Sequence, residues 1–172
     1  IGALRDHFDL GEVEIVEEEQ LAAVYGASLV HFPKTVTRRK GWWEDKRGRR
    51  ILHAGDRLTL CRKVMGRKPG EPLVRLAEVE VVRVQRQALG RLLPEWRERT
   101  GLTCMAAMCR WEATDCEHWS AYEAMEMAAE GFPGMDPAEF IDRFFVIPQA
   151  VFPEDDVTRI EWRYLDDEAA DG

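Results

Sequence analysis

The sequence lacks any long apolar run. Although 45% of its 172 residues are hydrophobic, 33% are charged, and no apolar stretch approaches the roughly 20 residues that a membrane-spanning helix needs. The first residues, Ile1 to Asp6, also lack the apolar core and the small-residue cleavage site of a secretion signal. We therefore expect a cytoplasmic globular protein that does not enter a membrane.

Cysteine is scarce, and several common catalytic motifs are missing. The four cysteines are irregularly spaced in a chain large enough to build its own core, so we expect reduced thiols and no disulfide scaffold. His7, His31 and His53 are isolated, and the sequence has no Ser-His-Asp set, phosphate-binding loop or dinucleotide fingerprint. These absences exclude kinase and dehydrogenase functions, and we expect no cofactor.

The charge is distributed unevenly along the chain. The net charge is -8, but the segment Lys34 to Lys68 holds 13 Lys or Arg against 3 acidic residues, a local charge of +10. The remaining residues contain 11 basic and 29 acidic side chains, a charge of -18. A polyanion would be attracted to the basic segment and repelled elsewhere. A solvated loop that balances acidic helices is the alternative interpretation.

Alternating polar and apolar residues predict strands on both sides of a polar segment. The stretch from Gly41 to Ala54 has no periodicity that would bury it, so it is predicted to be a loop. The predicted strands are Val13 to Val16, Arg57 to Val64, Val74 to Gln85 and Thr158 to Leu165. Their alternation predicts one barrel core that contains Leu58, Leu60, Leu76, Val79, Val81, Ile160 and Trp162.

Helices are expected near the start of the chain and between the last two strands. Glu18 to Tyr25 is predicted to be helical, and Leu89 to Phe145 is predicted to form helices broken at Gly101 and at 131–134. Asp136 followed by Pro137 is typical of a helix start. The pattern indicates a single α+β domain over residues 1–165, with an insertion at about 90–126 and a flexible acidic tail at 166–172.

An ordered set of short motifs resembles one known family. Lys34-Thr35-Val36-Thr37-Arg38-Arg39 resembles the Lys-Thr-x-Thr-x-Arg element of the ASCH domain, and Gly55-Asp56 opens the next strand as in that family. Ala129-Glu130-Gly131-Phe132, followed by Phe140, resembles its Glu-Gly-Phe helix region. The chain departs from the family at Pro33, where a glycine usually precedes the lysine. The resemblance implies a small PUA-like β-barrel whose cleft faces RNA or a modified nucleoside.

Some ASCH relatives are amidohydrolases that deacetylate N4-acetylcytidine, and ribonuclease activity is claimed for others. The resemblance assigns the catalytic roles of that branch to Lys34, Thr37 and Glu130. A threonine hydroxyl needs a base, and a lysine can act as that base only if burial leaves it neutral. Because residues three apart on a regular strand face opposite ways, Lys34 and Thr37 would have to flank a turn or twist. The alternative is that Thr35 and Thr37 are ordinary strand residues, Lys34 an exposed cation and Glu130 a helix-end acid.

The basic loop combines aromatic and cationic side chains, the usual combination for single-stranded nucleic acid. Two tryptophans are candidates for stacking on bases, although one of them would equally serve to cap the barrel. The basic side chains are candidates for contacts with phosphates. The residues predicted to bind nucleic acid are Arg38, Arg39, Lys40, Trp42, Trp43, Arg49 and Arg50.

Cys104, Cys109, Cys116 and His118 form the pattern C-x4-C-x6-C-x-H, which offers four potential zinc ligands, but this spacing is not a standard zinc pattern. Thr103 to Ala113 is predicted to be helical, and on a helix Cys104 and Cys109 would project about 140° apart. A buried helical stripe through Cys104 and Trp111 therefore explains these residues without a metal. We expect no metal, with zinc as the alternative.

Three functions remain open at this point. The first is a module that binds RNA, other single-stranded nucleic acid or a modified nucleoside through the pocket of the Lys-Thr motif. The second is a hydrolase that deacylates a modified nucleoside, and the third is a protein-interaction domain that uses the acidic helices. Burial of Lys34 beside Thr37 and a carboxylate would distinguish the hydrolase from the binding module.

Overall fold

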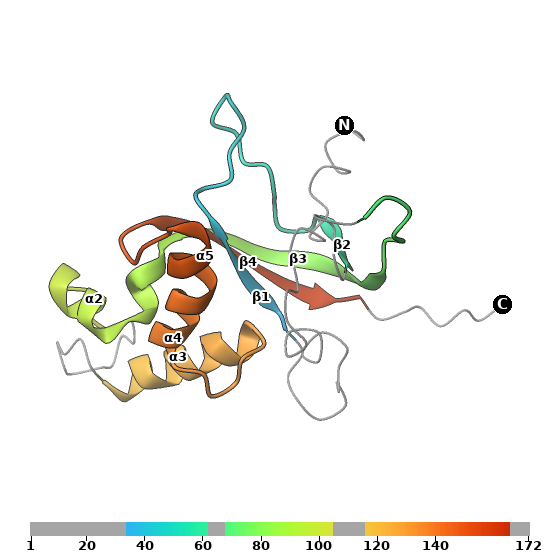
Figure 1. The fold of residues 1–172 in the computed structure, drawn as a ribbon. Coiled ribbons are helices and arrows are strands. Elements are labelled where there is room, and N and C mark those ends of the chain that lie inside the picture. Colours follow the sequence, from blue (N-terminus) through green and yellow to red (C-terminus); the bar gives the residue numbers. More distant parts are fainter. Residues whose placement is uncertain (1–33, 62–67, 105–115, 166–172) are drawn as a thin grey trace.

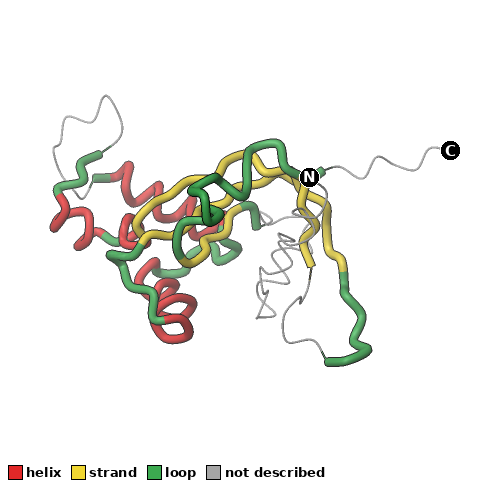
Figure 2. Tube along the Cα trace, turned by 90° about the horizontal axis from the view of Figure 1, so that it is seen from above, coloured by secondary structure: helices red, strands yellow, loops and turns green. Residues whose placement is uncertain are grey.

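The fold is α+β: one four-stranded antiparallel sheet with helices gathered at one end of it (Figures 1 and 2). The computed structural model describes residues 34–61, 68–104 and 116–165. The strands are β1 (Val36–Lys40), β2 (Arg57–Cys61), β3 (Arg75–Ala88) and β4 (Asp156–Tyr164). The helical segments are η2 (Leu89–Leu92), α2 (Pro94–Thr100), α3 (Glu117–Ala129), α4 (Pro137–Ile141), η3 (Asp142–Val146) and α5 (Ile147–Gln149).

The sheet has the order β1-β4-β3-β2, so β4 and β3 are central. β4 runs antiparallel to both neighbours, and its Ile160 lies opposite Thr37 of β1 and Val84 of β3. Three of the predicted strands are confirmed and correspond to β2, β3 and β4, with small shifts at the ends of β3 and β4. The predicted end of the β2 strand, at 62–64, lies outside the described residues. β1 was recognised only as a motif, and the structure adds it as an edge strand.

One face of the sheet carries a hydrophobic cluster, the sheet core, to which β2, β3 and β4 all contribute. The predicted barrel positions fall in this single cluster, with Leu76 half-buried at its margin. In the described residues, however, the sheet is open, because β1 and β2 lie at opposite edges and two strands separate them. The prediction of one shared core is therefore confirmed, and closure into a barrel is not observed in this part of the chain. The buried members of the sheet core are Leu52, Leu58, Leu60, Val79, Val81, Val84, Ile160 and Trp162.

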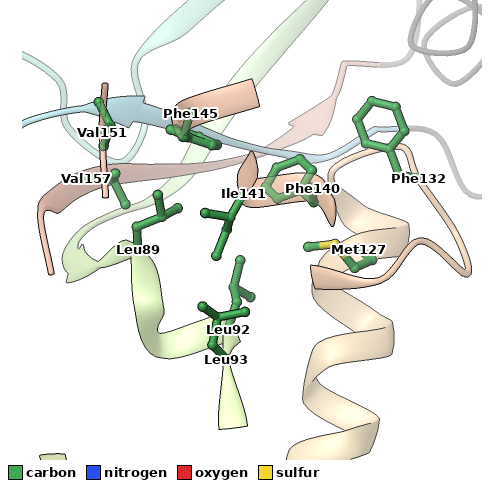
Figure 3. Close-up of a cluster of buried hydrophobic side chains, with 10 residues drawn as sticks. All are labelled: Leu89, Leu92, Leu93, Met127, Phe132, Phe140, Ile141, Phe145, Val151 and Val157. Atoms are coloured by element: carbon green, nitrogen blue, oxygen red, sulfur yellow. The ribbon is translucent and has the colours of Figure 1, made fainter. Parts of the chain in front are cut away.

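A second cluster, the helical core, joins the helices to the sheet (Figure 3). Val157 of β4 belongs to this cluster, and the other members come from η2, α3, α4, η3 and the residues next to them. The predicted helical stretch from Leu89 to Phe145 is confirmed over most of its described residues, with 102–104 as an exception. Its breaks follow the sequence: Gly101 ends α2 in the left-handed conformation, and the Asp136 carboxylate accepts a hydrogen bond from the Ala138 N–H at 3.1 Å to start α4.

Several predicted features lie outside the described residues. They are the strand at Val13 to Val16, the helix at Glu18 to Tyr25, most of the helix at Thr103 to Ala113, and the tail at 166–172. Thr103 and Cys104 themselves follow α2 in non-helical conformation, so the predicted helix does not begin at Thr103. No helix in the described ranges is long and apolar enough to cross a membrane.

Candidate functional site

The Lys-Thr motif leads into the edge strand β1, beside the end of α3. The Thr35 N–H donates to the Ala129 carbonyl at 2.8 Å, and the Thr35 carbonyl accepts from the Trp162 N–H at 2.9 Å. The Tyr164 hydroxyl donates to the Lys34 carbonyl at 2.6 Å. The backbone around Lys34 is therefore fixed by both α3 and β4, and the motif has little freedom to move by itself.

Glu130 occupies the C-cap of α3, and the Glu-Gly-Phe element is the reason that the helix ends there. The Gly131 N–H donates to the Ala128 carbonyl at 3.0 Å, and the Phe132 N–H donates to the Met127 carbonyl at 2.8 Å. This pair of bonds is a Schellman motif, which requires a left-handed residue after the cap; Gly131 has φ 94°. Phe132 then packs in the helical core with Met127, which holds Glu130 toward β1.

Lys34 and Glu130, 96 residues apart, form a buried ion pair. The Lys34 Nζ donates to Glu130 Oε2 at 3.0 Å and to the Glu130 carbonyl at 2.8 Å, and each residue is only 2% exposed. A cation at this position also neutralises the negative end of the α3 dipole. Burial lowers the pKa of the Lys34 ammonium, although the Glu130 carboxylate acts in the opposite direction. The alternative of Lys34 as an exposed cation is therefore wrong.

Two arginines and a second glutamate extend this pair into a buried ion network. Arg38 donates from Nη1 to Glu130 Oε1 at 2.7 Å and from Nη2 to Glu126. Arg159 donates to the two oxygens of Glu126 at 2.8 and 2.9 Å. We call Lys34, Arg38, Glu126, Glu130 and Arg159 the ion network. Its alternating charges satisfy one another away from water, as buried charges must.

Sequence reasoning identified Lys34, Arg38 and Glu130 but missed Glu126 and Arg159. A signal for Glu126 existed, since it lies four residues before Glu130 and therefore on the same helix face. Arg159 was visible only as a polar residue of an alternating strand. Its pairing with Arg38 across β1 and β4 is set by the strand register, which the sequence does not specify.

Thr37 is separated from the other two residues of the expected catalytic set. It lies within the regular strand β1, where it is 4% exposed and opposite Ile160 of the sheet core. Because side chains alternate along a strand, Thr37 projects from the face opposite to that of Arg38, which contacts Glu130. The structure thus brings Lys34 and Glu130 together and leaves Thr37 on the other face of the sheet.

The segment between β1 and β2 projects beyond the sheet before it returns (Figure 1). We call residues 40–54 the basic loop. Thr158 of β4 fixes the base of the loop, because its Oγ1 donates to the Gly41 carbonyl at 2.7 Å and accepts from the Trp43 N–H at 3.0 Å. Trp42 and Trp43 are half-buried and pack against the sheet core. The predicted loop is therefore a loop with an anchored base.

Exposed cations lie at the base of this loop and near its tip. Lys40, Arg49 and Arg50 are exposed, and the Arg50 guanidinium lies 5.4 Å from the centroid of the Trp42 ring. Arg39 is half-buried on β1. Arg38 does not fit its predicted contact with phosphates: it is 3% exposed, and its guanidinium is engaged by two carboxylates of the ion network.

Asp45 organises the tip and was not predicted to have a role. Its Oδ1 accepts from the N–H groups of Arg47 and Arg49 at 2.8 and 2.9 Å, and the Gly48 N–H donates to its carbonyl at 2.9 Å. The hydrogen bonds to its carboxylate, foremost that from the Arg49 N–H, lower the pKa of the Asp45 carboxyl. The pattern Asp-x-x-Gly is typical of a type I turn and was a usable signal in the sequence.

A cluster of soft donor atoms lies away from the ion network. Cys104, Cys116 and His118 each offer one ligand atom, and these atoms lie within 4.8 Å of one another. Cys109 lies outside the described residues. Desolvation acts to raise the pKa of the Cys116 thiol, but hydrogen bonds from the Trp119 N–H and from Cys104 and His118 outweigh it and lower the pKa to about 6.

No protein-family model, curated protein or solved structure matches this chain.

Proposed function

We propose that this protein binds single-stranded nucleic acid, RNA in particular, through the basic loop. One observation carries the proposal: Arg50 and Trp42 stand together on a loop of exposed cations whose base is anchored to β4. A tryptophan face stacks on any base, and neighbouring cations neutralise phosphates, so the combination suits an unpaired strand. The motif order that resembles the ASCH domain supports RNA as the ligand.

The ion network supports this function indirectly. It fixes β1, from which the basic loop departs, to α3 and β4. An anchored loop loses less conformational entropy when it binds than a free one would. We infer that Lys34, Arg38 and Glu130 hold the binding surface in place, while the contacts to nucleic acid come from Lys40, Trp42, Arg49 and Arg50.

A PUA-like barrel belongs to the same proposal. Support comes from the single sheet core, which gathers every strand position predicted to face a barrel interior. Closure needs a further strand to bridge the edges formed by β1 and β2.

The binding proposal is tested by the affinity for a fluorescent single-stranded RNA at several salt concentrations. Replacing Arg49 and Arg50 by alanine should weaken binding and reduce the slope of log affinity against log salt by about 1.4, since each lost phosphate contact on a single strand contributes about 0.7. Trp42→Ala should cost about 1–3 kcal/mol if its ring stacks on one base.

The matched control is the double variant Arg99→Ala, Arg143→Ala, which removes the same charge from exposed positions on the helices. This control should leave the salt slope unchanged. Salt-independent binding by the parent protein, or an equal loss in the control, would contradict the proposal.

Hydrolysis of an acylated nucleoside is the second candidate function. The lowered pKa of Lys34 favours it, because a lysine base must be neutral. The position of Thr37 on the opposite face weighs against it, so turnover would require β1 to rearrange. If the protein is a hydrolase, it should release acetate from N4-acetylcytidine, and Thr37→Ala and Lys34→Arg should both abolish the release, since guanidinium stays protonated. Absence of acetate from the parent protein would eliminate this candidate and leave RNA binding untouched.

A further inference from the structure

The cluster of Cys104, Cys116 and His118 has the dimensions of a metal site. The Cys116 Sγ lies 3.8 Å from the His118 Nδ1, and all three donor atoms fall within 4.8 Å of one another. Tetrahedral zinc with bonds of about 2.3 Å to sulfur and about 2.0 Å to nitrogen places neighbouring ligand atoms about 3.5–3.8 Å apart. A contraction of about 1 Å at most would therefore bring the three atoms around one ion.

The surrounding helices hold these ligands in place. Cys116 is the N-cap of α3, His118 lies in its first turn, and Cys104 follows α2 by a few residues. The two helices are joined by Arg97, which donates to the Glu123 carboxylate and whose guanidinium lies 4.4 Å from the centroid of the Trp119 ring. Arg97 is fully buried, so the contact between α2 and α3 is part of the packed structure. The approach of the ligands thus follows from the fold.

The chemistry of the donors selects the ion. Two thiolates and a neutral imidazole form a soft set that suits zinc and is a poor one for calcium or magnesium. The two thiolate charges would neutralise a divalent cation, and the two thiols would release their protons to solvent as it binds. Both cysteines are half-buried and His118 is exposed, so an ion can enter from solvent and a water molecule can take the fourth position.

We propose that Cys104, Cys116 and His118 bind one Zn²⁺ ion, which ties the end of α2 to the start of α3. The earlier interpretation of Cys104 as part of a buried helical stripe does not fit, because Cys104 is half-buried and does not lie on a helix. The site stands apart from the basic loop and does not depend on the proposed function. Because the ligands flank residues 105–115, the ion would join the two ends of that segment and should stabilise the folded chain.

The full chain, purified under reducing conditions without chelator, is the material for the test. Elemental analysis should find one zinc per chain. After removal of zinc, Co²⁺ should give the thiolate charge-transfer absorption and the visible bands of a tetrahedral site, and Zn²⁺ should displace it. Zinc should also raise the melting temperature of the metal-free protein.

Three variants, Cys104→Ser, Cys116→Ser and His118→Asn, should each weaken zinc binding by about tenfold or more. The controls Cys61→Ala, on β2, and His53→Asn, in the basic loop, should bind zinc as the parent does. His118 is exposed, so the His118→Asn variant should fold. It therefore keeps the test decisive even if a serine variant fails to fold. Absence of both zinc and the cobalt–thiolate band overturns the proposal, as does a Cys104–Cys116 disulfide in thiol-trapped protein or an equal loss in the controls.

Discussion

Glu126 is the residue on which two buried arginines converge. Its carboxylate accepts from Arg38 and from the Nε and Nη2 of Arg159, and the residue is 7% exposed. Desolvation acts to raise the pKa of Glu126, but hydrogen bonds and charge from Arg159 and Arg38 prevail and hold the pKa below its ordinary value. A carboxyl with this shift stabilises the folded state only while it is ionised.

Glu126→Gln should therefore lower the free energy of unfolding at pH 7 by about 3–5 kcal/mol, the usual cost of removing one partner from a buried ion pair. A depressed folded-state pKa means that the contribution of Glu126 is complete above the unfolded value of 4.5 and is lost as the pH falls through the folded value. The difference between parent and variant should accordingly shrink below about pH 4.5. Urea unfolding of parent and variant at a series of pH values measures this difference in the free energy of unfolding.

Glu98→Gln on the exposed surface of α2 is the control for the same chemical change. It should shift the free energy of unfolding by less than about 0.5 kcal/mol. A difference between the Glu126 variant and the parent that stays constant down to pH 3 would show that Glu126 is not stabilised by the two arginines.

The end of α3 is the element that places Glu130 against Lys34. The Schellman motif depends on Gly131 at φ 94°, a conformation that disfavours any residue with a Cβ atom. Gly131→Ala should lower the free energy of unfolding by about 1–2 kcal/mol and should loosen the contact between α3 and β1. Hydrogen exchange reports on that contact directly, because the Thr35 N–H is bonded to the Ala129 carbonyl.

Gly70→Ala is the matched comparison, since Gly70 has φ 82° in an exposed turn distant in sequence from α3. Both variants should be strained, but only Gly131→Ala should accelerate the exchange of the Thr35 amide. Equal acceleration in the two variants would mean that global unfolding, rather than the end of α3, controls this amide.

At the scale of the whole molecule, folding sorts the positive charge of the segment Lys34 to Lys68. Lys34 and Arg38 turn inward and are neutralised by buried carboxylates. Lys40, Arg49 and Arg50 stay exposed on the basic loop, where Arg49 pairs with Asp45 at 2.7 Å. The local charge of +10 is therefore larger than the positive charge that this segment presents to a nucleic acid at the surface. The acidic remainder of the chain should confine association to the loop.

The sequence by itself determined three of the four strands, several helix ends and most of the sheet core. Alternation along β3 and β4, Asp136 before Pro137, and the glycines that end α2 and α3 are local signals, and each works through a few neighbouring residues. The same locality explains why the motifs containing Lys34 and Glu130 could be recognised before their contact was known.

Only the tertiary structure decided which charges are buried and which face they occupy. The pairing of Arg159 with Glu126, the burial of Arg38 and the separation of Thr37 from Lys34 depend on the register between β1 and β4 and on the docking of α3. The approach of Cys104 to Cys116 and His118 depends likewise on the packing of α2 beside α3. These contacts join residues distant in sequence, so no local pattern specifies them.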